Sequence, residues 1–210
     1  MTSDKPSRRI QLNDGAARQR WRRDCLAAPH GGARAAARTA LEVHPLGVRW
    51  TTRALQLTAG VGITGPIPRL TDYEGTGGPF FIDADGQQRD PILDDLALWV
   101  RTDQGLVVIV GCSHAGVVNT LRHALGVSGE SRLHAVLGGF HLAEASEVRL
   151  TRTMAALWEL GPDLIVPCHC TGGAAVERLR QTFGARVVPG SAGAVFRLGV
   201  APTSQSRERS

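Results

Sequence analysis

The second half of the chain repeats one pattern of apolar and polar positions three times. Each repeat is an apolar run, a small turn that carries a histidine, and a stretch with helical spacing. The runs and turns are Leu106–Val110 with Gly111-Cys112-Ser113-His114, Leu133–Leu137 with Gly138-Gly139-Phe140-His141, and Leu164–Val166 with Pro167-Cys168-His169-Cys170. This pattern predicts strand-helix units of an open α/β sheet. In such a sheet the carboxyl ends of neighbouring strands meet at one edge, where ligands and metals bind.

A helix is expected after each histidine because apolar residues recur there at helical intervals. Gly161-Pro162-Asp163 predicts the end of the second helix, and Gly184 the end of the third. The recurring residues are Val117, Val118, Leu121 and Leu125, then Val148, Met154, Leu157 and Leu160, then Ala175, Val176, Leu179 and Phe183. Each helix returns the chain to the sheet.

The segment before the first histidine is predicted to form strands and turns. Leu96–Val100 and Leu106–Val110 are predicted to pair through the turn at residues 102–105, and residues 83–86 form a second turn. The two prolines of the loop 64–69 exclude regular helix. Two further short strands are expected near the end, at Arg186–Val188 and Ala194–Leu198.

Charge divides the chain of 210 residues into a basic tail and a near-neutral domain. Residues 1–41 hold nine basic and three acidic residues, a net charge of +6, which leaves −1 for residues 42–210. Arginine, alanine and glycine dominate this tail, which has little apolar periodicity, so residues 1–41 are predicted to be disordered. Interspersed aspartates and the lack of interleaved aromatics argue against a nucleic-acid partner. One domain is expected over residues 42–200, with residues 201–210 disordered.

Two further features narrow the protein class. The sequence contains no apolar run long enough to cross a bilayer, so no membrane role is expected. The four cysteines do not form the framework of a small disulfide-rich domain. A reducing, cytoplasmic location is therefore predicted.

His114, His141 and His169 are the candidate metal ligands because they occupy matched strand-end positions. Three protein ligands with one open position are the usual arrangement of a catalytic zinc, whose bound water ionises near neutral pH. A divalent metal, zinc first, is the expected cofactor. The alternative for any single strand-end histidine is a core or turn residue that hydrogen-bonds the backbone. The remaining histidines are interpreted as structural or exposed.

Several other polar residues near these turns could have a functional or a structural role. Cys112, Cys168 and Cys170 could join a mixed His/Cys site, but the favoured interpretation is a small residue buried under the turn. Asp94 and Asp95 are interpreted as a polar turn before a strand. Arg69 could bind a substrate phosphate or carboxylate through its planar guanidinium, and a surface role is equally open.

These strings resemble the dihydropterin and ribofuranosyl-aminobenzene-phosphate synthase-like subfamily of the metallo-β-lactamase-fold hydrolases. The resemblance rests on residues 111–121, 138–142 and 167–172, and on Thr64-Gly65-Pro66-Ile67-Pro68-Arg69, where Pro66 replaces the family's glutamate. It implies an α/β, metallo-β-lactamase-like αββα sandwich, one or two divalent metals, and a phosphorylated or pterin-like small-molecule substrate. His114 and His169 would be ligands, with His141 a ligand or a substrate-side group.

One family motif is missing from the 210 residues. The superfamily's His-x-His-x-Asp-His string, which supplies the first metal's ligands, does not occur in the sequence. The sandwich is therefore expected to be incomplete, with its second half retained. An uncovered sheet face would favour association with another copy of the chain.

Two function classes follow. In the first, the chain is a metal-dependent hydrolase in which His114, His141 and His169 hold the ion. In the second, it is a truncated, non-catalytic relative that acts as a binding or association module. Metal content and turnover discriminate between them.

Overall fold

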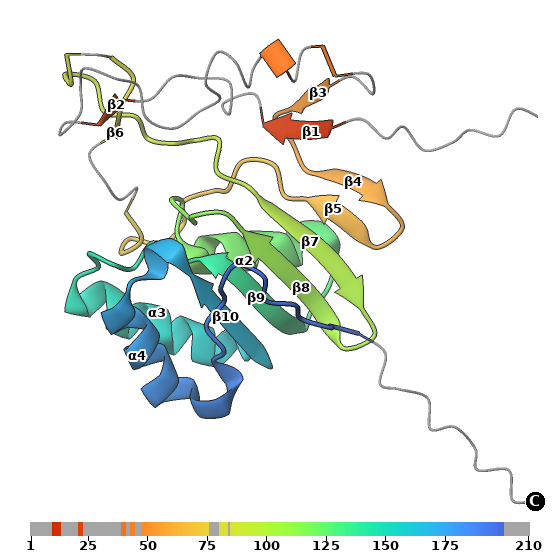
Figure 1. Ribbon diagram of the computed structural model, residues 1–210, viewed down its shortest axis with the longest axis vertical. Helices are drawn as coiled ribbons and strands as arrows, with labels where there is room; N and C mark the ends of the chain where they lie inside the picture. Colours follow the sequence, from red (N-terminus) through yellow and green to blue (C-terminus); the bar gives the residue numbers. More distant parts are fainter. Residues whose placement is uncertain are drawn as a thin grey trace, which may run out of the picture.

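A six-stranded mixed sheet forms the centre of the computed structural model, which describes residues 10–13, 21–22, 39–40, 43–44, 48–75, 80–83 and 85–199 (Figure 1). Its strands lie in the order β10-β9-β8-β7-β5-β4. They are β4 (Leu55–Thr58), β5 (Val61–Ile63), β7 (Ala97–Thr102), β8 (Gly105–Val110), β9 (Leu133–Gly139) and β10 (Leu164–Cys168). Strands β8, β9 and β10 are parallel, and the other neighbours in the sheet are antiparallel.

The predicted hairpin between the two apolar runs is confirmed. Ala97 pairs with Val110 and Thr102 with Gly105, so residues 103–104 form the turn between β7 and β8. Alternate residues of both strands face the helices, which explains why Ala97, Trp99, Leu106 and Val108 are buried. This hairpin fixes the direction of β8, and therefore the sheet edge at which the turn with His114 lies.

The three helices expected after the histidines are present as α2 (Val117–Ser128), α3 (Glu147–Leu160) and α4 (Gly173–Phe183). Ser146 caps α3 by accepting a hydrogen bond from the Arg149 backbone N–H. Gly161 and Gly184 occupy the C-cap positions of α3 and α4, as predicted. Local sequence therefore predicted the three helices and the ends of α3 and α4.

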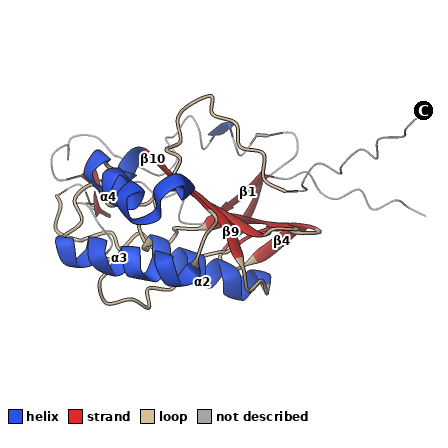
Figure 2. Cartoon of the chain, turned by 90° about the horizontal axis from the view of Figure 1, so that it is seen from below, coloured by secondary structure: helices blue, strands red, loops and turns tan. Residues whose placement is uncertain are grey.

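The helices α2 and α3 lie along one face of the sheet, with α4 beside α3 (Figures 1 and 2). One core joins them to the sheet and includes Leu121 of α2, Leu157 of α3, Leu179 of α4 and Val108 of β8. The α/β prediction is confirmed, and the described sheet with its helices corresponds to one α layer and one β layer of the expected αββα sandwich.

The segment after α4 crosses the sheet face opposite α2 (Figure 1). Val187 forms one bridge to Ile165 beyond the 3-10 turn η4 (Gly184–Arg186), so the predicted strand Arg186–Val188 is reduced to that bridge. The strand predicted at Ala194–Leu198 is wrong because this segment lies across the sheet instead of continuing along an edge strand. Ile109 of β8 stays 40% exposed on the same face. Association with another copy stays a prediction.

In the part of the chain that the structure describes, four short strands lie outside the main sheet. They are β1 (Ile10–Asn13), parallel to β3 (Val48–Thr51), and β2 (Trp21–Arg22), antiparallel to β6 (Phe80–Phe81). Most of the predicted disordered tail, and all of residues 201–210, lie outside the described residues. Among the described helices, none has the length and apolar character that a bilayer span requires.

Candidate metal centre

Hydrogen bonds from the backbone and from two hydroxyl side chains tie the carboxyl ends of β8, β9 and β10 together. The Gly139 N–H donates to the Gly111 carbonyl over 2.9 Å, and Ser113 Oγ donates to the Gly139 carbonyl over 2.8 Å. On the other side, the Phe140 N–H donates to Thr171 Oγ1 over 3.1 Å. Thr171 ends the single 3-10 turn η3 (His169–Thr171) that follows β10. The three histidine turns therefore form one connected edge, as the repeated pattern predicts.

His114 and His141 lie side by side at this edge, with ring centroids 4.3 Å apart. Their Nδ1 atoms are buried and find no hydrogen-bond partner within the part of the chain that the structure describes. Buried polar atoms in proteins are nearly always paired, so an orphaned ring nitrogen needs an explanation. His141 also has a backbone φ of 50°, a left-handed conformation that is uncommon outside glycine and concentrates at functional sites.

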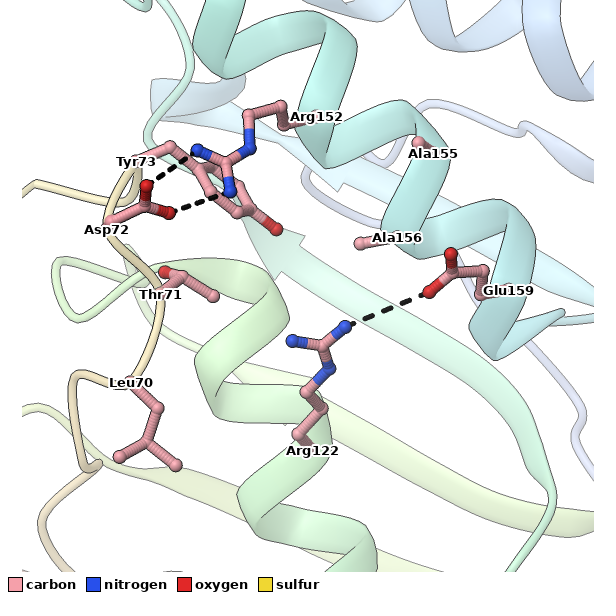
Figure 3. A pocket seen from close by; sticks show the side chains of 9 residues that line it. All are labelled: Leu70, Thr71, Asp72, Tyr73, Arg122, Arg152, Ala155, Ala156 and Glu159. Carbon is pink, nitrogen blue, oxygen red and sulfur yellow. Dashed lines mark hydrogen bonds and ion pairs between the residues drawn. The ribbon is translucent and has the colours of Figure 1, made fainter.

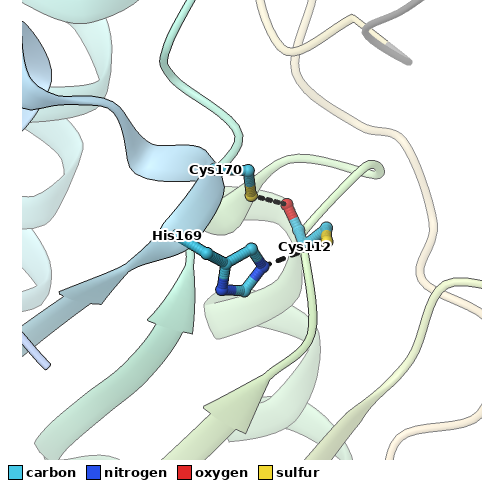
Figure 4. Close-up of side chains that lie close together, drawn as sticks. All are labelled: Cys112, His169 and Cys170. Carbon is cyan, nitrogen blue, oxygen red and sulfur yellow. Dashed lines mark hydrogen bonds between the residues drawn. The ribbon is translucent and has the colours of Figure 1, made fainter. Parts of the chain in front are cut away.

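His169 points to the cysteines of the same edge. Its Nε2 atom lies 3.1 Å from Cys112 Sγ, and the Cys170 thiol donates to the Cys112 carbonyl over 3.6 Å (Figure 4). The ligand atoms of Cys112, His169 and Cys170 all lie within 4.8 Å of one another. Among the described residues, this is the one group of three potential ligands that comes so close together, and His114 and His141 are not part of it.

The electrostatics of the edge favour neutral imidazole and one thiolate. Burial, followed by the charge of Arg149, lowers the pKa of His141. Neutral imidazole is the form that binds metals. A hydrogen bond between the two thiols raises the pKa of Cys112 to about 11 and lowers that of Cys170 to about 7.

Asp95 and Arg69 hold the turn that carries His114. Asp95 Oδ2 accepts a 2.8 Å hydrogen bond from the Ala115 N–H, and burial raises the pKa of this carboxyl. Arg69 Nη1 donates to the His114 carbonyl over 2.7 Å, while its Nη2 donates to the carbonyls of Pro91 and Ile92. These contacts give Arg69 a positioning role, and its contact with a substrate stays a prediction.

Glu74 closes the amino end of α2, the helix that follows His114. Its two carboxylate oxygens accept hydrogen bonds from the N–H groups of Val118 and Asn119 over 2.9 and 2.8 Å. The side chain is almost fully buried, and this burial raises its pKa. No residue of α2 itself provides a side-chain cap, so the cap comes from a distant loop.

Two interpretations from the sequence are corrected here. Cys112 and Cys170 are not buried under their turns, because both stay partly exposed and gather at His169. Asp95 is more than a polar turn residue, since it anchors the His114 loop. Neither role has a local sequence signal, because each depends on residues that meet only in the folded chain.

Two cavities lie near the helices and the sheet edge. One, of about 340 Å³, lies between α2 and α3, where Arg152 pairs with Asp72 and Arg122 faces Glu159, so its arginines are matched by carboxylates (Figure 3). The other, of about 430 Å³, adjoins His169 under the C-terminal segment. Its lining includes Leu137, Val166 and Phe196, so apolar groups dominate a cavity that opens beside the candidate ligands.

The residues at the strand ends fit a borderline-soft divalent ion. Imidazole and thiolate are the donors that zinc prefers, and the two orphaned Nδ1 atoms leave lone pairs or protons without a protein partner. Magnesium and calcium favour oxygen donors instead. These donors fit a borderline-soft divalent ion better than magnesium or calcium.

A solved structure of a metal-dependent hydrolase of the β-lactamase superfamily is similar to this chain, with a TM-score of 0.78 and 28% sequence identity. The match covers 93% of this chain and 73% of that structure. This chain is a metallo-β-lactamase-fold protein. The similarity confirms the family resemblance that the strand-end motifs indicate.

Two curated proteins of Methanocaldococcus jannaschii are similar in sequence to this metallo-β-lactamase-fold chain. The first is 7,8-dihydropterin-6-methyl-4-(beta-D-ribofuranosyl)-aminobenzene-5'-phosphate synthase, 31% identical over 148 residues, which are 68% of this chain and 50% of that protein. The second is an uncharacterized protein, 32% identical over 120 residues, which are 57% of this chain and 43% of that protein. The chain thus spans about half the length of these relatives. No family model matches it.

Proposed function

We propose that this chain is a metal-dependent hydrolase whose His114, His141 and His169 hold a divalent ion, with zinc the first choice. The observation that carries the proposal is the convergence of three strand-end histidine turns at one edge, where His114 and His141 present orphaned ring nitrogens. The metal-dependent hydrolase that shares this fold supports the same chemistry.

The bound ion would supply Lewis acidity toward an ester or phosphoester. The chain's own residues prepare the ligands for it. Burial and Arg149 favour the neutral form of His141, and Asp95 holds the backbone next to His114. Positioning of ligands by a surrounding set of hydrogen bonds raises metal affinity in such sites.

The proposed substrate is a small phosphorylated or pterin-like compound. The cavity beside His169 supports this class, because its apolar lining with Phe196 suits a flat ring system next to the candidate ligands. The related synthase, whose name includes a dihydropterin and a ribofuranosyl phosphate, supports it as well. A homo-oligomer and a reducing cytoplasmic setting belong to the same proposal, the latter because the three described cysteines are free.

A second function has one specific observation in its favour. The sequence lacks the His-x-His-x-Asp-His string from which the superfamily builds its first metal site. A non-catalytic relative that binds metal or associates with another chain would need no such string. The two functions differ in turnover and agree on metal binding.

Metal analysis and turnover of the purified full chain test the proposal. We expect bound zinc in the wild type, loss of that zinc in His114→Ala and His169→Ala, and zinc-dependent hydrolysis of p-nitrophenyl phosphate or bis-p-nitrophenyl phosphate. His134→Ala, a change at a histidine near the amino end of β9 that pairs with Asp163, serves as the control. Zinc without turnover on either compound would support the non-catalytic relative. Absence of bound metal, or metal unchanged in both variants, would contradict the proposed centre.

A further inference from the structure

Three potential ligands from two different turns gather around the end of β9. Cys112 follows β8, whereas His169 and Cys170 follow β10, and 57 residues separate Cys112 from His169 in the sequence. Their ligand atoms nevertheless lie within 4.8 Å of one another (Figure 4). Two thiols and one imidazole on one side of a sheet edge make a different donor set from the three histidines.

The distances suit coordination of one ion. Around a tetrahedral zinc with ordinary Zn–S and Zn–N bond lengths, neighbouring donor atoms lie about 3.6–3.8 Å apart. The Sγ atom of Cys112 and the Nε2 atom of His169 are 3.1 Å apart, so a small rotation of either side chain brings them to that spacing. All three donor atoms lie within 4.8 Å of one another, close to that spacing.

The end of β9 leaves space for this donor set. A Cβ atom on Gly139 would come within 2.5 Å of both Cys170 Sγ and His169 Nε2, so the missing side chain creates the room that these two donors occupy. The backbone at Gly139 forms the floor beneath these donors. Hydrogen bonds hold it in place, because the Gly139 N–H donates to the Gly111 carbonyl and the Gly139 carbonyl accepts from Ser113 Oγ. The donors therefore converge over backbone that is hydrogen-bonded to the neighbouring turn.

We propose that Cys112, His169 and Cys170 form a mixed thiolate and imidazole site for one zinc or similarly soft divalent ion. Two thiolates neutralise a divalent charge, and three protein ligands leave one open position. The thiolates select zinc, cadmium or cobalt over magnesium and manganese. The inference deepens the proposed metal centre, on which it rests through the shared ligand His169.

Cobalt substitution of the full chain tests this ligand set directly. Thiolate ligation gives cobalt(II) a sulfur-to-metal charge-transfer absorption in the near ultraviolet, whereas ligation by histidine alone does not. The reduced protein is loaded with cobalt(II), and metal content is measured in parallel. We expect the absorption in the wild type, a marked loss in Cys112→Ser and Cys170→Ser, and at least a tenfold fall in zinc affinity in both variants.

Cys168→Ser is the matched control, because Cys168 belongs to the same turn but its thiol points to the Val166 carbonyl. We expect its cobalt spectrum to equal that of the wild type. In His114→Ala, any cobalt that stays bound is expected to keep the charge-transfer absorption, since His114 does not belong to the proposed donor set. Circular dichroism verifies that each variant is folded.

The possible results separate the two proposals. Bound cobalt without a charge-transfer absorption, lost in His114→Ala and unchanged in the cysteine variants, would overturn the thiolate site and leave the histidine centre standing. No metal in the wild type would overturn both. If a cysteine variant does not fold, the wild-type spectrum decides, because a reduced, metal-loaded chain without the absorption contradicts thiolate ligation.

Discussion

The Sγ atom of Cys170 lies 2.5 Å from the place where a Cβ atom on Gly139 would stand. His169 Nε2 lies at the same distance from that place. The strand end of β9 and these two side chains after β10 are thus in direct steric contact, and any side chain at residue 139 must displace both of them.

Gly139→Ala should therefore disrupt the metal site more than the fold. The atoms that meet the new methyl group are the ends of two side chains, which can rotate away while the backbone stays in place. We expect zinc affinity to fall at least tenfold, with a loss of folding stability of about 1 kcal/mol. Zinc titration and urea unfolding measure the two effects.

Gly138→Ala, in contrast, should disrupt the fold itself. Gly138 has a φ of 131°, and a Cβ atom there would stand 2.1 Å from the backbone oxygen of Val110, which cannot rotate away. We expect this variant to lose about 3 kcal/mol or more of stability. Equal stability losses in the two variants would contradict the assignment of Gly139 to the floor of the site.

Glu74→Ala should destabilise the protein although Glu74 lies 44 residues before Val118, in the helix that it caps. The change leaves two buried N–H groups, those of Val118 and Asn119, without an acceptor. We expect a loss of about 1–3 kcal/mol in the free energy of urea unfolding. Glu147→Ala, at the exposed start of α3, is the control and should change stability by no more than about 0.5 kcal/mol. Similar losses in both variants would argue against the capping role.

Arg69→Lys distinguishes a positioning role from substrate contact. A lysine ammonium cannot span the carbonyls of His114, Pro91 and Ile92 that the guanidinium joins. We expect a stability loss of about 1–3 kcal/mol and weaker zinc binding. Arg122→Lys, whose partner Glu159 is 3.9 Å away at the surface, should be nearly neutral. Unchanged stability with weaker substrate binding would instead assign Arg69 to the substrate.

Asp163 should make a contribution to folding stability that is lost at acid pH. A hydrogen bond with His134, followed by the charge of Arg132, lowers the pKa of this carboxyl below its ordinary value of 3.8. Its stabilisation is therefore complete above the unfolded-state pKa and disappears as pH falls through the lower folded-state pKa. The stability difference between wild type and Asp163→Asn, at most about 1 kcal/mol, should vanish in that acid range. A difference that grows toward low pH would refute this linkage.

Local patterns predicted the strand-helix units, the β7-β8 hairpin and the helix ends at Gly161 and Gly184. Each of these depends on residues close together in the sequence, whose periodicity and turn chemistry act locally. The segment Ala194–Leu198 has the composition of a strand, but no sheet edge accepts it along its length. The conformation of this segment depends on the sheet face that it crosses, and local composition does not encode that contact.

The sequence by itself determined that three histidine turns end neighbouring strands, because apolar periodicity sets where each strand stops and the parallel sheet brings those ends to one edge. Only the tertiary structure decided which side chains meet there. Asp95 reaches Ala115 across 20 residues, and Cys112 reaches His169 across 57. Such contacts depend on the register of β8 against β9 and β10 and on side-chain direction, which arise when the sheet packs as a whole.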